Sequence, residues 1–492
     1  MKDLKARTIR GSFARLCAQI ASFLLRIGSL MILARLLGPK DFGLVGMVTA
    51  FTGVLTLLRD FGLSSAAIQR ATVTEDQQST LFWLNMLTGA LLGLLMIGLA
   101  PAIAAFYHEP RLLGVTAILA LGFFFNAAGV QHLVILQREM RFTSLAAIGV
   151  LSLLISSAIG IAGAKAGFGY WALVVMTVSL PLTSTIGFWL TADWVPGKPR
   201  RRCGLRSMIR FGGTVTLNGL IVYLATNFDK VLLGRFWGVE TLGLYGRAYQ
   251  LINIPTDNLN SAAGEVAFAV LSRLQNEPAR LKSYFLKGYS LILALTMPIT
   301  VLCAFFSNDI ILVLLGAKWA NAAPLFRLLA PTILVFAIAN PLSWLLSSIG
   351  LVSRLLKMGF VIAPVMIISY AVGLPFGPKG VAFAYSAVMT LWLVPLVIWA
   401  LRGTVVRPQD ILVRVAQQLL TSLLAAGLAF TARSFYGQWL PPWPRLALES
   451  AVLFLGSVGM ILLFTEQKIF YMDLLRGLVK RGPVEDHSPV SV

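Results

Sequence analysis

Arg26 is the first residue whose type and position suggest a binding role, because this charged side chain lies in the middle of a long apolar run. A charge at the centre of a bilayer costs at least about 2.5–3.5 kcal/mol, so it normally faces protein or water. Polar residues recur around Arg26 at spacings of three and four, which places them on one helical face. They are Ser12, Arg15, Gln19, Ser22 and Ser29. This spacing predicts a membrane helix with one polar face, which contacts water or protein and not lipid.

Three further apolar segments carry polar faces of the same kind, which predicts a shared cavity. In such a cavity, cationic and amide side chains could bind an anionic substrate. The candidate substrate-binding residues are Arg26, Gln19, Arg59, Asn218, Lys230, Arg247 and Gln250. Local pairing is the alternative: Asp229 with Lys230 or Arg247, and Arg59 with Asp60.

Three acids inside predicted membrane segments are candidate proton or sodium sites. They are Asp229, Asp257 and Glu265. The sequence contains no phosphate-binding loop, no dinucleotide-binding glycine motif, no zinc-protease motif and no ligating cysteine pair. It therefore predicts no cofactor, no metal site and no ATP hydrolysis by this chain, so an ion gradient or consumption of the product would have to drive any transport.

The composition places the chain in a membrane. Of its 492 residues, 57% are hydrophobic and 12% are charged, whereas soluble domains have about 25% charged residues. The net charge of +21 could indicate nucleic-acid binding. Basic residues in cytoplasmic loops explain the charge more simply, and we expect no nucleic-acid partner.

Fourteen apolar segments are long enough to be membrane spans. We place them at 14–36, 42–58, 80–101, 113–136, 144–164, 169–191, 211–233, 242–270, 286–306, 323–348, 355–374, 380–401, 411–432 and 446–464. Pro255 should kink the eighth span, and residues 308–316 favour a short interfacial helix.

The distribution of positive charge predicts the orientation of these spans. With a cytoplasmic N-terminus, 28 of the 41 Lys and Arg residues fall in inside segments and nine fall outside. This bias predicts that both termini and the loop from Asp193 to Arg210 are cytoplasmic. The outside loops are all short, which leaves no room for an outside catalytic domain.

An internal repeat divides the chain. Arg35-Leu-Leu-Gly38-Pro-Lys-Asp-Phe-Gly43-Leu matches Arg235-Phe-Trp-Gly238-Val-Glu-Thr-Leu-Gly243-Leu at an offset of 200 residues. We therefore predict an all-α membrane protein with two six-helix bundles related by pseudo-twofold symmetry, plus two C-terminal helices. The predicted parts are an N-terminal bundle (1–193), a basic linker (194–210), a second bundle (211–405), the extra helix pair (406–466) and a cytoplasmic tail (467–492).

Several short motifs resemble polysaccharide flippases of the MOP exporter superfamily, nearest to the branch that exports colanic acid and lipopolysaccharide units. They are the segments beginning at Ala34 and Asp60, then Gln69-Arg70, Asp229-Lys230-Val-Leu-Leu-Gly234, Gly243-Leu-Tyr245 and Arg247-Ala-Tyr249. Their order and spacing cover essentially the whole chain.

This resemblance implies a non-enzymatic flippase of the bacterial inner membrane. Its substrate would be an undecaprenyl-diphosphate-linked oligosaccharide for exopolysaccharide or lipopolysaccharide synthesis. Membrane lipids and other polysaccharide-assembly proteins would be its partners, and the cavity would be lined by spans one, two, seven and eight. The alternatives are a cation-coupled multidrug antiporter of the same superfamily, a membrane polysaccharide polymerase or ligase, and a scaffold that transports nothing.

Overall fold

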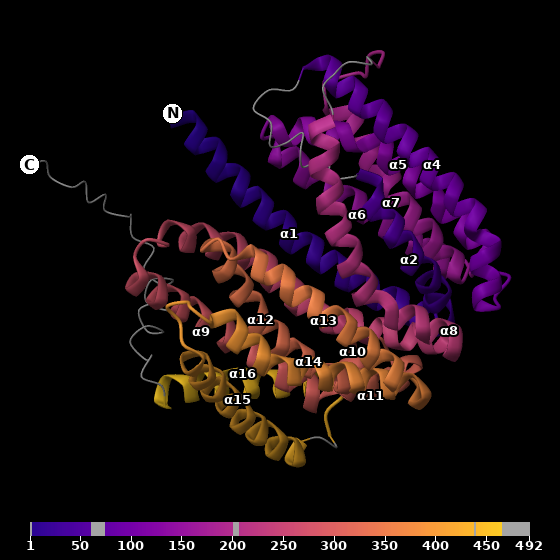
Figure 1. The fold of residues 1–492 in the computed structure, drawn as a ribbon. Coiled ribbons are helices and arrows are strands. Elements are labelled where there is room, and N and C mark those ends of the chain that lie inside the picture. The colour runs from indigo at the N-terminus through magenta and orange to yellow at the C-terminus, as the bar shows by residue number, and fades with distance from the viewer. Residues whose placement is uncertain (1, 61–73, 200–205, 437–438, 465–492) are drawn as a thin grey trace, which may run out of the picture. The chain divides into compact units, whose positions relative to one another are not determined.

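The computed structural model describes residues 2–60, 74–199, 206–436 and 439–464 (Figure 1). All regular elements among these residues are helices. The structure therefore confirms the all-α prediction for the part of the chain that it describes. The predicted cytoplasmic tail (467–492) lies entirely outside the described residues, as does the middle of the predicted linker.

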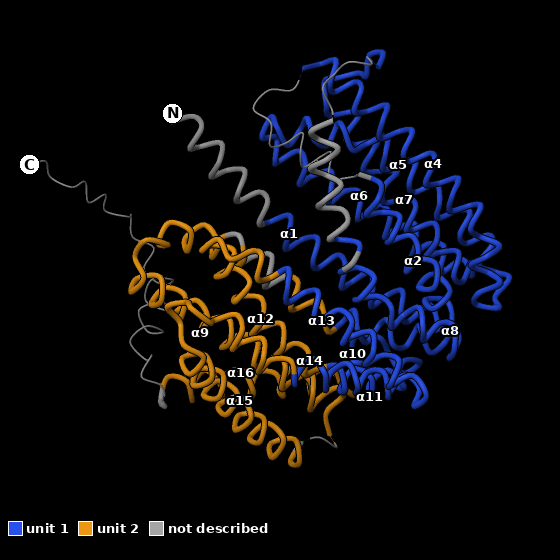
Figure 2. The backbone as a smooth tube through the Cα atoms, in the orientation of Figure 1, with its two compact units in different colours: residues 1–251, 311–329, 356–391 blue, residues 252–310, 330–355, 392–492 orange. Residues whose placement is uncertain are grey.

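The chain forms two compact units, each built from segments far apart in sequence (Figure 2). Unit 1 contains residues 1–251, 311–329 and 356–391, and unit 2 contains residues 252–310, 330–355 and 392–492. Unit 1 draws on both predicted halves of the chain. The predicted division into two six-helix bundles therefore stays a prediction.

The helices of unit 1 begin with six that follow the first six predicted spans. They are α1 (Lys2–Leu36), α2 (Pro39–Asp60), α4 (Glu75–Tyr107), α5 (Leu112–Arg138), α6 (Phe142–Lys165) and α7 (Tyr170–Thr191). The unit also holds most of α8 (Arg206–Arg273), η1 (Ala317–Ala322), α11 (Ala323–Leu329), η2 (Leu374–Phe376) and most of α13 (Val352–Gly373) and α14 (Gly377–Leu401).

Unit 2 is organised around α9 (Pro278–Phe305), which contacts α12 (Pro331–Ser348), α15 (Pro408–Tyr436) and α16 (Pro442–Phe464). The first half of the short helix α10 (Ser307–Leu314) also belongs to it. A buried apolar cluster ties α9 to the α15–α16 pair. It consists of Val301, Phe306, Ala426, Ala429 and Leu453.

Eleven stretches of the described chain are long and apolar enough to cross a membrane. The predicted eleventh and twelfth spans form one of them, Val352–Leu401, and the predicted seventh and eighth spans both lie in α8. Inside α8, Gly238 has φ 79° and ψ −177°, so the helix is broken there. That break falls at the turn that the internal repeat predicts, but the count of fourteen spans is not confirmed.

The two repeat motifs face each other within unit 1. A Cβ atom on Gly43 would lie 1.9 Å from the carbonyl oxygen of Val239, and one on Gly243 would lie 1.9 Å from the carbonyl oxygen of Pro39. These contacts are reciprocal at the repeat offset of 200 residues. Only glycine permits so close a backbone approach, so the repeat read from the sequence has a direct structural counterpart.

The segment around η1 covers the end of α1. The last carbonyl groups of a helix lack partners within that helix. Here the indole of Trp319 donates to the Ala34 carbonyl at 2.8 Å, and the ammonium of Lys318 donates to the Arg35 carbonyl at 3.3 Å. The Trp319 ring also meets Phe42 edge to face at 5.3 Å. Unit 1 thus fixes the turn between α1 and α2 from outside the first six helices.

Candidate functional site

Lys230 lies in the first part of α8, three residues after Asn227 and therefore on the same helical face. Its ammonium group donates to Asn227 Oδ1 at 2.6 Å. The same ammonium lies 4.8 Å from the centre of the Tyr249 ring, which α8 supplies after its break at Gly238. An amide oxygen and an aromatic face thus hold this cation.

Arg247 lies on the second part of α8 and is held in the same manner. Its guanidinium donates to the side-chain oxygen of Gln250, three residues later. The guanidinium carbon lies 4.0 Å from the centre of the Phe42 ring on α2. Neither Arg247 nor Lys230 forms an ion pair with a described carboxylate. The local pairing of Asp229 with these two cations is therefore not what the structure shows.

Asp229 is fully buried beside Lys230. One carboxylate oxygen accepts the backbone N–H of Lys230 at 2.8 Å, and the other accepts the Tyr245 hydroxyl at 2.7 Å. A buried carboxylate needs such donors because desolvation penalises its charge. Hereafter, "the α8 site" names two sets of residues on α8: Asn227, Asp229, Lys230, Tyr245 and Tyr249 around the Lys230 ammonium, and the pair Arg247 and Gln250, whose guanidinium lies against Phe42.

The α8 site can bind an anion. No carboxylate among the described side chains forms an ion pair with Lys230 or Arg247, and both cations are held by groups that a stronger acceptor can outcompete. Guanidinium and ammonium groups form charge-assisted hydrogen bonds with phosphate and carboxylate oxygens. Arginine adds a planar fork that suits two oxygens at once.

The remaining predicted binding residues lie on α1 and α2 or have a side chain outside the described set. Arg26 and Gln19 are exposed on α1, and Arg59 is partly buried near the end of α2. Arg26 forms no ion pair with a described residue, and its own carbonyl accepts the Ser29 hydroxyl at 3.1 Å. The side chain of Asn218 is outside the described set. A single cavity that joins all seven residues remains a prediction.

The three predicted ion-coupling acids have different surroundings. Asp229 is buried in unit 1, whereas Asp257 is exposed and belongs to unit 2. The side chain of Glu265 lies outside the described residues. Of the three, Asp229 alone has a buried environment that the structure describes.

Four charged residues that the sequence did not single out as a site form a second cluster, inside unit 2. Arg433 on α15 contacts Asp309 of α10 at 2.9 Å and Glu449 of α16 at 3.2 Å, and Arg445 also contacts Asp309. Both acids are nearly or fully buried. We call these four residues the C-terminal charge cluster. Glu449 lies inside the last predicted span and was overlooked there. Arg445, four residues earlier in the same short stretch, was the available signal.

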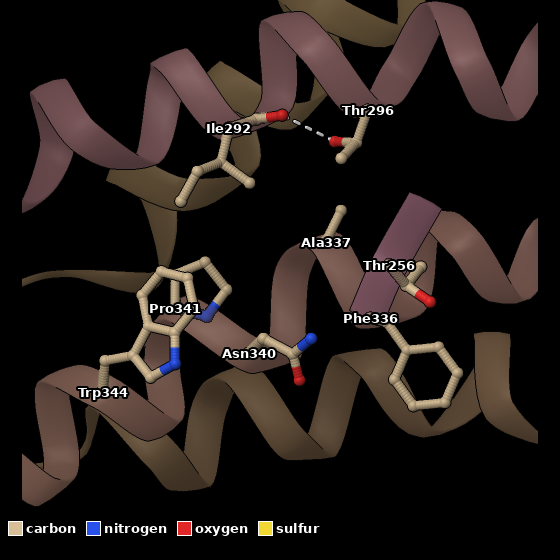
Figure 3. Close-up of a pocket in the computed structure, with 8 residues that line it drawn as sticks. All are labelled: Thr256, Ile292, Thr296, Phe336, Ala337, Asn340, Pro341 and Trp344. Carbon is tan, nitrogen blue, oxygen red and sulfur yellow. Dashed lines mark hydrogen bonds between the residues drawn. The ribbon is translucent and has the colours of Figure 1, made fainter. Parts of the chain in front are cut away.

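A small cavity in unit 2 is the other candidate for a ligand site (Figure 3). Its volume is about 10 Å³, which is about the space that one water molecule requires. Figure 3 shows Asn340, Thr256 and Thr296 around it, with the Thr296 hydroxyl bonded to the Ile292 carbonyl. None of its described lining residues carries a charge. The lining residues are Thr256, Ile292, Thr296, Phe336, Ala337, Asn340, Pro341 and Trp344. The cavity is too small and too neutral for a diphosphate.

Residues 32–324, more than half of the chain, match the family described as polysaccharide biosynthesis protein. The chain belongs to this family. Among curated relatives, this chain is 30% identical over 298 residues to the teichuronic acid biosynthesis protein TuaB of Bacillus subtilis (strain 168), and the match covers 58% of this chain and 59% of TuaB. It is 25% identical over 350 residues to the lipopolysaccharide biosynthesis protein WzxC of Escherichia coli (strain K12), covering 70% of each chain.

Solved structures show the same fold for this polysaccharide biosynthesis protein. The lipid II flippase MurJ, in an inward closed conformation, matches 94% of this chain and 99% of its own with a TM-score of 0.73 at 15% identity. An inward-facing multidrug resistance MATE transporter of the MOP superfamily matches 81% of this chain and 98% of its own, with a TM-score of 0.62 and 15% identity. The predicted MOP fold is therefore confirmed.

Proposed function

We propose that this protein is a flippase that moves lipid-linked oligosaccharides across the bacterial inner membrane, with undecaprenyl diphosphate as the carrier. The observation that carries the proposal is that Lys230 and Arg247, both on a helix predicted to span the membrane, are held by neutral partners. The names of TuaB and WzxC as biosynthesis proteins for teichuronic acid and lipopolysaccharide, and the fold shared with a lipid II flippase, support it.

On binding, a diphosphate would replace the amide oxygens that accept from Lys230 and Arg247. A diphosphate offers several anionic oxygens, each a stronger acceptor than the amide oxygens of Asn227 and Gln250. A hydrogen bond to a charged group contributes about 1.5–3 kcal/mol, or about tenfold in affinity for every 1.4 kcal/mol. Losing one cation should therefore weaken diphosphate binding by roughly ten- to a hundredfold.

The same charges favour a flippase over a multidrug antiporter, although both share this fold. An organic cation would be repelled by Lys230 and Arg247. No catalytic role is assigned to any described residue, and we propose that the protein is not an enzyme.

The test is transport in proteoliposomes. A fluorescent undecaprenyl-diphosphate-linked oligosaccharide would be loaded in one leaflet, and its arrival in the other would be measured by quenching. We expect Arg247→Gln to slow transport at least about tenfold. Lys165→Gln, which removes an exposed positive charge at the end of α6, is the matched control and should transport normally. Equal rates for wild-type protein and empty liposomes would refute the flippase assignment.

Orientation is proposed on the charge bias of the loops, with both termini and the Asp193–Arg210 loop in the cytoplasm. Cysteine placed at Lys198 should then resist an impermeant thiol reagent in intact cells, whereas cysteine at Lys40 or Lys379 should react. All three positions are exposed. The reverse labelling pattern would invert the proposed direction of transport.

A further inference from the structure

Asp229 is a buried carboxyl group that neutral donors alone hold among the described residues. Its exposed fraction is 0%. Its oxygens accept from the Lys230 backbone and the Tyr245 hydroxyl, while the Lys230 ammonium is directed to Asn227 instead. Keeping a carboxylate charged in such surroundings is costly. Burial of Asp229 therefore favours its neutral, protonated form.

Phenol groups from three helices surround Asp229. The Tyr245 and Tyr249 rings are 6.1 Å apart between centres, Tyr249 and Tyr385 are 6.3 Å apart, and Tyr385 and Tyr370 are 5.4 Å apart. All belong to unit 1. The charged or titratable groups that face Asp229 are Lys230, Tyr245 and Tyr249 from α8, Tyr370 from α13 and Tyr385 from α14. Lys230 is therefore the only cation among the described groups that face it.

One of these phenols has spare hydrogen-bonding capacity. The Tyr370 hydroxyl is fully buried and makes no hydrogen bond with a described residue. A buried hydroxyl without a partner is costly. A hydroxyl without a partner in this cluster leaves the hydrogen bonds around Asp229 free to rearrange when the carboxylate gains a proton.

We propose that Asp229 binds a proton reversibly, and that its protonation sets the affinity of the α8 site for an anion. The proton passes from water to Asp229 Oδ2, and no covalent bond other than this O–H forms. The new O–H donates to the Tyr245 oxygen, and the Tyr245 hydrogen turns away from Asp229. The carboxyl group is then neutral, so Lys230 presents its charge without an opposing charge on the next residue.

A proton suits Asp229 better than a metal cation. Both carboxylate oxygens are already directed at hydrogen atoms, from an N–H and an O–H. A cation at these oxygens would face the positive ends of both donors, whereas a proton reverses one hydrogen bond and keeps the other. Sodium, which the sequence left open beside the proton, would require both donors to move.

The inference rests on the proposed function only in supposing that the α8 site binds a diphosphate. Linkage then requires that the anion and the proton favour each other equally. Diphosphate should bind more tightly as the pH falls, and its binding should draw a proton from solution.

The test measures binding of undecaprenyl diphosphate to the full-length protein in nanodiscs across a pH series. We expect at least about fivefold tighter binding at the acidic end than at the alkaline end. Asp229→Asn should bind tightly at every pH, apart from the titration of the probe itself. Tyr245→Phe should keep the fold and shift the pH at which affinity changes. A pH dependence that is the same in Asp229→Asn and wild type would overturn the proposal, as would weaker binding by Asp229→Asn at every pH.

A second measurement needs no variant at Asp229 and therefore holds even if that variant does not fold. Proton uptake on adding undecaprenyl diphosphate would be followed with a pH dye in weakly buffered solution. Wild-type protein in nanodiscs should take up more protons than empty nanodiscs, which report the probe's own titration. Binding without extra uptake would refute the proton role alone, whereas no binding at any pH would refute the proposed function as well.

Discussion

The α8 site and the C-terminal charge cluster both bring buried charges into a membrane protein, but they neutralise them differently. In the cluster, each charge meets an opposite charge: Arg433 contacts Asp309 and Glu449, and Arg445 contacts Asp309. In the α8 site, Lys230 and Arg247 meet amide oxygens and aromatic faces. Charges that form ion pairs with each other stabilise the fold, whereas charges that contact only amide oxygens and aromatic rings can still form an ion pair with a ligand.

The largest effect should come from breaking the C-terminal charge cluster. Arg433→Gln leaves Asp309 and Glu449 buried with one cation fewer, and removing one partner of a buried ion pair costs about 3–5 kcal/mol. We expect a marked fall in thermal stability and in the amount of protein in the membrane. Transport per molecule should stay normal in whatever protein remains.

A charge-balanced variant provides the control. Replacing Arg433 by Gln together with Glu449 by Gln removes one charge of each sign, so most of the lost stability should return. The measurement is a double-mutant cycle of unfolding midpoints. Additive losses would show that Arg433 and Glu449 do not depend on each other, and the contrast between the two regions would fail.

Lys230→Gln should produce the reverse pattern. Its hydrogen-bonding and ring partners Asn227 and Tyr249 are neutral, and the backbone N–H of residue 230 still donates to Asp229, so the unfolding free energy should fall by less than in Arg433→Gln. Transport should fall by about tenfold or more. A variant that unfolds easily but transports normally would place Lys230 with the structural charges.

Arg26 on α1 provides another test of whether a charge stabilises the fold or binds substrate. Its side chain is exposed and forms no ion pair with a described residue, so Arg26→Ala should be made at normal levels. If Arg26 contacts substrate, that variant should lose export and Arg26→Lys should restore it in part, because lysine lacks the arginine fork. Full export by a normally expressed Arg26→Ala variant would remove Arg26 from the site.

The smallest effect should come from the pair in the loop between α4 and α5. The hydrogen bond from Arg111 holds the pKa of the Glu109 carboxyl below its ordinary value, at a distance of 2.7 Å. Arg111 is half exposed, and such pairs contribute about 0–1 kcal/mol. Because the folded pKa is the lower one, this contribution is present above the unfolded value of about 4.3 and is lost as the pH falls through the folded value. Glu109→Gln should therefore match wild type at low pH in thermal melts, and a gap that widened there would contradict the assignment.

Helical spacing was enough to single out several residues of the α8 site from the sequence, and their role in binding stays a prediction. Lys230, Arg247 and Gln250 stood out because a charged or amide side chain in an apolar run needs a partner, and the structure gives each one. The repeat also predicted the break at Gly238, where φ is positive. These features depend on residues near each other in the chain.

The phenol cluster could not be read in this way. Tyr370 and Tyr385 come from helices more than a hundred residues beyond α8, and tyrosine in an apolar run is typical of packing or of the membrane interface. The C-terminal charge cluster was missed for a similar reason, since Arg433 and Arg445 read as outside-loop charges and Asp309 as part of a short interfacial helix. Contacts between distant segments decide both regions.

The contact between the repeat motifs bears on how the chain arose. Lys40 and Glu240 occupy equivalent positions and pair with each other at 3.5 Å. If the halves descend from one duplicated segment, the ancestral chain placed the same residue at both positions, so any charge there faced its own copy. The present pair of opposite charges could form only after the two halves diverged. Around Gly43 and Gly243 the opposite applied, because the reciprocal backbone approach excludes a side chain from either copy. A single contact thus records one position where the duplicates had to differ and one where they had to stay alike.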